Sequence, residues 1–349
     1  MYNKYLILTL SFFCLIIILP FIGIFSKLNF DFYSLLVFIN NTYIVKIIYF
    51  TFYQAFFSAV LSCLIAIPFA LALNRHKNLK IVRYLVSICG FSFVIPSILI
   101  VYAVIKLFGI NGFYNHYFNF YELFGINSIY GLKAILIAHI LLNAPFATRL
   151  FFQNLDNIPN KYYEISSSLN LTFFGNIIKL EIPIIKQNLF SVFSIIFSLC
   201  FLSFAIVMVL GGSPLNSTIE VAIYQFALFE LNFNKAIFLS FIQIFICSIF
   251  IFIGFNKMKG SKYFEIKNNI YTHPYKNYKF IKLIDYILIL ILSLLLFSPI
   301  VFIILNFFYN GFIENILFTS EFLNALFNSL VISIITGLIV SILGLLITI

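Results

Sequence analysis

Eight apolar segments, each long enough to cross a bilayer as a helix, constrain the fold of this chain more than any other feature. About 20 consecutive apolar residues span the roughly 30 Å of hydrocarbon in a membrane. Mean hydropathy is +1.09, and only 9% of the residues are charged. A soluble globule of 349 residues could not bury so much apolar surface, which excludes cytosolic enzymes and nucleic-acid-binding modules. The sequence predicts an all-α, polytopic integral membrane bundle with helices over residues 5–25, 44–73, 81–108, 129–152, 189–210, 236–255, 283–308 and 323–349.

The distribution of basic residues predicts the orientation. With the N-terminus in the cytoplasm, 16 of the 21 Lys and Arg residues fall on the cytoplasmic side, and seven of these lie in residues 257–282. Cytoplasmic loops of membrane proteins carry such an excess. The net charge of +10 is therefore interpreted as a topology signal and not as a nucleic-acid patch. We expect a multi-pass protein of a bacterial inner membrane, embedded in the lipid bilayer.

Groups that could carry chemistry are scarce. The five cysteines lie singly inside apolar runs, a spacing that suits neither a disulfide framework nor a metal site. The predicted helices hold no Asp or Glu near their centres, and His139 is the deepest ionisable residue. Ion-coupled transporters and membrane enzymes usually need such buried groups. Both classes are weaker alternatives, and no cofactor is expected.

An internal repeat predicts the domain organisation. At a shift of 278 residues, small residues of the second apolar segment fall on small residues of the eighth, for example Thr51 on Ser329 and Ala55 on Ser333. Small residues let membrane helices pack closely, so the match indicates a shared packing face. We predict a six-helix unit over 1–256, a basic cytoplasmic linker over 257–282, and the first two helices of an incomplete second unit over 283–349. Because the sequence stops inside an apolar run, we expect a piece of a longer or split protein.

One polar loop, residues 153–187, carries the sharpest local pattern. Pro159 and Asn160 can start a short helix. Asn170 can stop it, because asparagine tolerates the left-handed conformation. Thr172 can cap a second short helix, and Pro183 is expected to break the chain before the next span. Two short helices on a cytoplasmic loop would form a knob that docks in a partner's groove.

This loop resembles the EAA loop of binding-protein-dependent ABC-transporter permeases. The family pattern is Glu-Ala-Ala, three residues, Gly, nine residues, then Ile-x-Leu-Pro, and this chain keeps the spacing while Ile165 and Ser166 replace the two alanines. The resemblance implies that the loop transmits the motion of an ATPase. Glu164 occupies the Glu position of the pattern, Asn170 the Gly, Leu180 the Ile, Ile182 the Leu and Pro183 the Pro.

Three further stretches, residues 52–58, 130–150 and 204–225, look like the thiamine and thiamine pyrophosphate permease subfamily. That resemblance implies the membrane subunit of an ATP-driven importer with no covalent chemistry of its own. It also implies three kinds of partner: ABC ATPase subunits, a periplasmic solute-binding protein, and a second permease half or copy. A permease for ferric iron or another small solute is the nearest alternative.

Four residues are candidates for the substrate passage. Asn143 lies beside Pro145 and either satisfies backbone freed by a helix kink or binds substrate. Gly211 and Gly212 either end the fifth helix or permit close approach of a substrate. Glu220 is expected on the outer side, where it could attract a cationic substrate, contact the binding protein, or remain a solvated loop charge.

Overall fold

The computed structural model contains helices and turns, and no strand, over the residues that it describes. These residues are 11–12, 14–16, 18–23, 37–38, 40–123, 128–212, 216–256, 273–276, 278–309 and 319–348. Seven helices in these ranges are long and apolar enough to cross a membrane. The prediction of an all-α, polytopic membrane bundle is thus confirmed. Much of the predicted first span, residues 5–25, and much of the linker, residues 257–272, lie outside the described residues.

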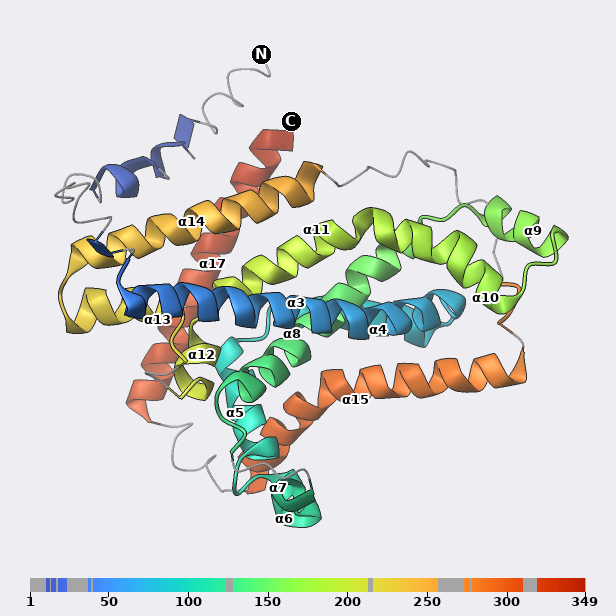
Figure 1. Ribbon diagram of the computed structural model, residues 1–349, viewed down its shortest axis with the longest axis horizontal. Helices are drawn as coiled ribbons and strands as arrows, with labels where there is room; N and C mark the ends of the chain where they lie inside the picture. Colours follow the sequence, from blue (N-terminus) through green and yellow to red (C-terminus); the bar gives the residue numbers. More distant parts are fainter. Residues whose placement is uncertain are drawn as a thin grey trace. The chain divides into compact units, whose positions relative to one another are not determined.

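The chain divides into two compact units, Tyr33–Ile303 and a second made of Met1–Phe32 with Ile304–Ile349. The larger unit contains the polar loop, residues 153–187, and most of the long helices (Figure 1). Its helices are α3 (Thr42–Arg75), α4 (Lys80–Phe91), α5 (Ser97–Phe108), α6 (Phe113–Phe118), α7 (Phe120–Leu123), α8 (Leu132–Asp156), α9 (Asn160–Ser168), α10 (Phe173–Asn176), η1 (Ile177–Glu181), α11 (Ile182–Phe201), α12 (Ala205–Leu210), α13 (Ile219–Tyr224), η2 (Gln225–Phe229), α14 (Phe233–Asn256) and the greater part of α15 (Lys279–Tyr309).

Helix α3 is the centre of the larger unit and packs against α8 and α11. Its contact face is built from small residues. Ala55, Ala59 and Ala66 have no exposed surface, and Cys63 is 4% exposed. Small side chains let the helix axes approach, so packing contacts replace the weak hydrophobic drive between helices in lipid.

Two of the predicted spans are each broken in the structure. Residues 81–108 form α4 and α5, separated by a turn that ends at Pro96. A proline disfavours helical backbone in the residue before it, which explains this break. Residues 189–210 fall in α11 and α12, which are separated between Phe201 and Ala205. That interval contains no proline or glycine, so the second break depends on tertiary contacts described below.

Helix α17 (Ser320–Thr348) belongs to the smaller unit and corresponds to the predicted eighth span. Its small polar residues are exposed, in contrast to their counterparts on α3. The hydroxyls of Ser329, Ser333 and Thr336 donate to carbonyls of their own helix, at 2.7–2.8 Å. These bonds satisfy the hydroxyls without any neighbouring helix.

Candidate functional site

The first part of the loop between α8 and α11, from Pro159 to Gly175, folds as its sequence predicts. Helix α9 begins after Pro159 and ends at Ser168. Asn170 has a φ of 50°, which places it in the left-handed region. Thr172 then caps α10, its side chain accepting a 3.1 Å hydrogen bond from the Gly175 N–H. The predicted helix stop and helix cap are both confirmed.

The expected break at Pro183 is wrong. Helix α10 leads through η1 into α11 without interruption, and Pro183 is the second residue of α11. The first turn of a helix tolerates proline because its N–H needs no partner within the helix. The π-helical turns of η1 precede the proline directly. The loop thus has two arms. The first arm is α9, and the second arm, formed by α10 and η1, continues directly into α11.

The exposed surface of this loop carries apolar side chains. Ile165 and Leu169 on the first arm are 55% and 67% exposed, and Phe174 and Ile178 on the second arm are 70% and 61% exposed. Of the residues matched to the EAA pattern, Glu164, Asn170 and Pro183 are exposed, while Leu180 and Ile182 are half-buried. An apolar knob with one exposed carboxylate suits a partner's groove better than free solvent.

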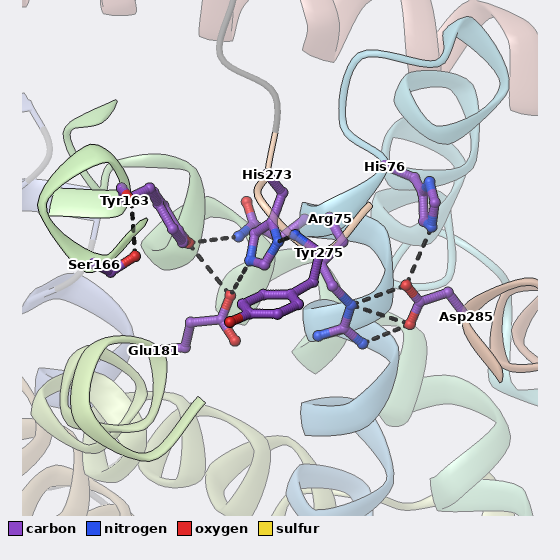
Figure 2. Close-up of polar contacts among 9 residues, drawn as sticks. Arg75, His76, Tyr163, Ser166, Glu181, His273, Tyr275 and Asp285 are labelled. Atoms are coloured by element: carbon purple, nitrogen blue, oxygen red, sulfur yellow. Dashed lines mark hydrogen bonds and ion pairs between the residues drawn. The ribbon is translucent and has the colours of Figure 1, made fainter. Parts of the chain in front are cut away.

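Beneath this surface lies a set of buried polar residues that the sequence analysis missed, here called the ionic cluster. Each member is at most 5% exposed, and Figure 2 shows Arg75, His76, Tyr163, Glu181, His273 and Asp285 close together. The members are Asn74, Arg75 and His76 at the end of α3, Tyr163 in α9, Glu181 in η1, His273 before α15, and Asp285 in α15.

One half of the ionic cluster is centred on Glu181. The Tyr163 hydroxyl donates to Glu181 Oε1 at 3.3 Å and accepts from Asn74 Nδ2 at 3.1 Å. His273 Nε2 lies 3.2 Å from the same carboxylate oxygen. Burial and the neighbouring Glu181 carboxylate raise the pKa of the Tyr163 phenol well above its ordinary value. The phenol therefore stays protonated and able to donate.

The other half is centred on Asp285. Arg75 Nε donates to both carboxylate oxygens, at 3.1 and 2.9 Å, and Arg75 Nη2 donates to Oδ1 at 2.5 Å. His76 Nε2 lies 3.1 Å from Oδ2. The forked guanidinium matches the carboxylate geometry, which favours a fixed orientation over a loose ion pair.

The available sequence signal for this half was Asp285 itself. It is an acidic residue near the start of the predicted span 283–308, surrounded by Ile, Leu and Tyr. Arg75, at the end of α3, is only 5% exposed. Its partner is 210 positions away in the sequence, so no local pattern could reveal the pair.

A second polar region, here called the polar seam, lies along the middle of α3. It consists of Thr51, Gln54 and Ser58 of α3, with His139 and Asn143 of α8 and Cys200 of α11. Ser58 Oγ lies 2.8 Å from His139 Nδ1, and Asn143 Nδ2 donates to Cys200 Sγ at 3.2 Å. The polar seam contains no carboxylate, lysine or arginine.

The polar seam also supports the broken part of the bundle. Gln54 Nε2 donates to the Cys200 carbonyl near the end of α11, at 3.0 Å. Thr51 Oγ1 accepts from the Ile219 N–H at the start of α13, at 2.9 Å. Helix ends leave backbone groups without partners in the helix, and irregular backbone inside a membrane protein needs such substitutes. The Gln54 bond helps to explain how α11 can end where its sequence gives no stop signal, and the Thr51 bond satisfies the start of α13.

The four passage candidates lie on different elements. Asn143 is buried and bound within the polar seam. Gly211 ends α12, and Gly212 follows with a φ of 68° in open space, so the interpretation of this pair as a helix end agrees with the structure. Glu220 is half-buried in α13 and accepts a 2.8 Å hydrogen bond from Gln243 of α14. Glu220 is thus held by a neighbouring helix.

Known proteins resemble this chain in sequence and in fold. No model of a known protein family matches the sequence. The chain is 32% identical over 267 residues to a thiamine transport system permease protein, ThiP, of Haemophilus influenzae, covering 76% of this chain and 49% of the relative. It is 33% identical over 211 residues to ThiP of Escherichia coli, covering 60% of this chain and 39% of the relative. The chain spans about half or less of the length of these curated relatives.

The fold matches that of a solved ABC transporter. A chain from a bacterial ABC transporter involved in the import of the acidic polysaccharide alginate aligns with a TM-score of 0.58 and 15% identity. The alignment covers 73% of this chain and 93% of that chain. The resemblance to permeases of ABC importers, and to the thiamine permeases among them, is therefore confirmed.

Proposed function

We propose that this chain forms one half of the membrane passage of an ATP-driven importer for thiamine or thiamine pyrophosphate. The observation that carries the proposal is the 32% identity to a thiamine permease over 267 residues. Because the match covers three quarters of the chain, it includes the central loop with α9 and α10. Similarity of this extent supports a shared transport role, with selection of cargo assigned partly to other subunits.

The geometry of the loop supports its use as the coupling element. Glu164 is exposed on α9 next to an exposed apolar surface, while Leu180 packs against the hydrophobic core. A knob of this kind can seat in a groove of an ATPase subunit and pass its motion to α11. ATP hydrolysis is assigned to that separate subunit, and the chain itself performs no covalent chemistry.

The broken region from the end of α11 to α13 is the proposed lining of the passage. Discontinuous helices and irregular backbone in transporters commonly line the substrate path. Gly211 and Gly212 lie in this region, Glu220 follows it, and Asn143 reaches its start through Cys200. We assign these residues to the passage, with Glu220 toward the outer side.

The remaining partners follow from the same transport role. We propose a periplasmic solute-binding protein on the outer side and a second permease half or copy that completes the passage. The proposed location is the bacterial inner membrane, with the N-terminus and the loop with α9 and α10 in the cytoplasm. The proposed division of the chain stays 1–256, 257–282 and 283–349.

Reconstitution tests the cargo. Liposomes containing the chain, its second half, the ATPase and the binding protein should accumulate radiolabelled thiamine only when ATP is supplied. If the liposomes accumulated ferric iron and not thiamine, the proposed cargo would be wrong. Uptake that needs a sodium or proton gradient and no ATP would overturn the ATP-driven mechanism.

A charge reversal tests the coupling loop. Glu164→Lys should reduce association with the ATPase while leaving insertion and folding unchanged, because the side chain is exposed. The matched control is Glu230→Lys, which reverses an exposed glutamate beyond η2. Loss of membrane insertion by the first variant, instead of loss of partner binding, would assign the loop a structural role.

A further inference from the structure

We propose that the ionic cluster holds the coupling loop (residues 153–187), α3 and α15 together, so that the three segments move as one body. This inference rests on the proposed function, because the loop is taken as the element that an ATPase moves. The cluster members would act as positioning residues, since they lie beneath the docking surface and do not form it. The structural basis is that the end of α3, the two arms of the loop and the start of α15 meet at buried carboxylates.

The first connection closes the loop on α3. Tyr163 and Glu181 come from the two arms of the loop, and a hydrogen bond joins them. Asn74 of α3 donates to the same Tyr163 hydroxyl. Ser166, one turn along α9, is 3% exposed and donates to the Tyr163 carbonyl at 2.7 Å. The buried face of α9 is therefore attached to the end of α3 while its other face is free to dock.

The second connection brings in the start of α15. His273 lies against Glu181, with its ring in edge contact with Tyr163 at 5.1 Å between centroids. The Tyr275 hydroxyl donates to the Leu171 carbonyl between the two arms of the loop. The segment before α15 thus touches both the first arm and the turn that joins the arms.

The third connection locks α15 to α3. Asp285 binds Arg75 and His76, which directly follow the asparagine that holds Tyr163. The Arg75 guanidinium also lies 5.3 Å above the ring of Phe173, the first residue of α10. The last two residues of α3 and its C-cap residue, His76, therefore connect the loop to α15; Figure 2 shows Arg75 and His76 beside Asp285. Separating any of these segments would leave a buried ion unpaired, which is strongly unfavourable.

The test measures how tightly the cluster holds the loop, with no ATPase or substrate present. Ser166→Cys places a nearly isosteric thiol on the buried face of α9, and Cys14, which is exposed, is replaced by alanine. Labelling by a membrane-impermeant maleimide in inverted vesicles then reports opening of the loop. Glu181→Gln and Asp285→Asn should each raise the labelling rate at least about tenfold, because lost buried contacts make local opening more frequent.

Two further variants make the test specific. Asp156→Asn breaks the Lys77–Asp156 ion pair of 3.1 Å, which joins the ends of α3 and α8 outside the cluster, and should leave the labelling rate unchanged. His273→Ala should raise the rate, whereas His273→Gln, which keeps a donor toward Glu181, should restore most of the slow labelling. Circular dichroism confirms that each variant retains its helices.

Each outcome decides the proposal. Unchanged labelling in Asp285→Asn would overturn it, because α15 would then not be connected to the loop. Equal acceleration by Asp156→Asn would also overturn it, since any weakened helix end would have the same effect. If the chain shows the expected rates but never binds an ATPase or transports thiamine, the role of the ionic cluster in holding the three segments together stands and the proposed function is wrong.

Discussion

The ionic cluster and the polar seam satisfy buried polar groups of the same bundle by different chemistry. The ionic cluster lies at the end of α3 next to the loop and pairs carboxylates with a guanidinium and imidazole rings. The polar seam lies along the middle of α3 and uses two hydroxyls, two amides, an imidazole, a thiol and backbone groups. Both join α3 to segments distant in the sequence.

The difference follows from the position along the helix. Charged groups are most costly near the centre of a bilayer and less so toward helix ends. A neutral seam can therefore hold broken helices together in the middle of the bundle, while ions are confined to the end where the loop attaches. The consequence is a difference in energy, because removing one partner of a buried ion pair costs more than removing one neutral hydrogen bond.

Removing the guanidinium is the largest test of this difference. Arg75→Leu should destabilise the larger unit by about 3–5 kcal/mol, because it leaves the Asp285 carboxylate buried without its main partner. Equilibrium unfolding in mixed micelles measures the change. The control is Lys77→Leu, two residues later. Lys77 forms an ion pair with Asp156, and the side chains of Lys77 and Asp156 are 15% and 27% exposed. That pair should contribute about 0–1 kcal/mol. A loss for Arg75→Leu no greater than that of its control would remove the distinction between the two regions.

A change in the polar seam should have a smaller effect. Ser58→Ala removes the hydroxyl that lies 2.8 Å from His139 Nδ1 and should cost about 1–3 kcal/mol, since the ring nitrogen is left buried without that partner. Ser198→Ala is the matched control, because this buried hydroxyl donates to the Ser194 carbonyl of its own helix. The same unfolding assay compares the two. If Ser58→Ala destabilised the unit as much as Arg75→Leu, neutral and ionic contacts would be equivalent here.

Sequence reasoning succeeded where the signal was local. The apolar runs predicted the long helices, and the αL preference of Asn170 and the capping ability of Thr172 predicted the two arms of the loop. The break after Phe201 was missed, because Gln54 stabilises the end of α11 from another helix.

The ionic cluster was missed for the same physical reason. Glu181 belongs to the EAA-like stretch, yet its partners come from α3, α9 and the segment before α15. Charge and spacing along the chain reveal neither its burial nor these contacts. The roles assigned to Glu164, Asn143 and Glu220 remain predictions, because they depend on partners and cargo outside this chain.

The smallest expected effect lies in the turn of the loop, outside both polar regions. Asn170 holds a φ of 50°, a conformation that costs most L-residues about 1–2 kcal/mol and that asparagine and glycine adopt more readily. Asn170→Gly should therefore change stability by only a few tenths of a kcal/mol, because relief of backbone strain offsets the greater entropy of the unfolded chain. Asn170→Val should cost about 1–2 kcal/mol. Limited proteolysis of the loop in inverted vesicles measures both, and it should detect faster cleavage for the valine variant alone. Equal cleavage of the two variants would mean that the ionic cluster, and not the local backbone preference, holds the two arms in place.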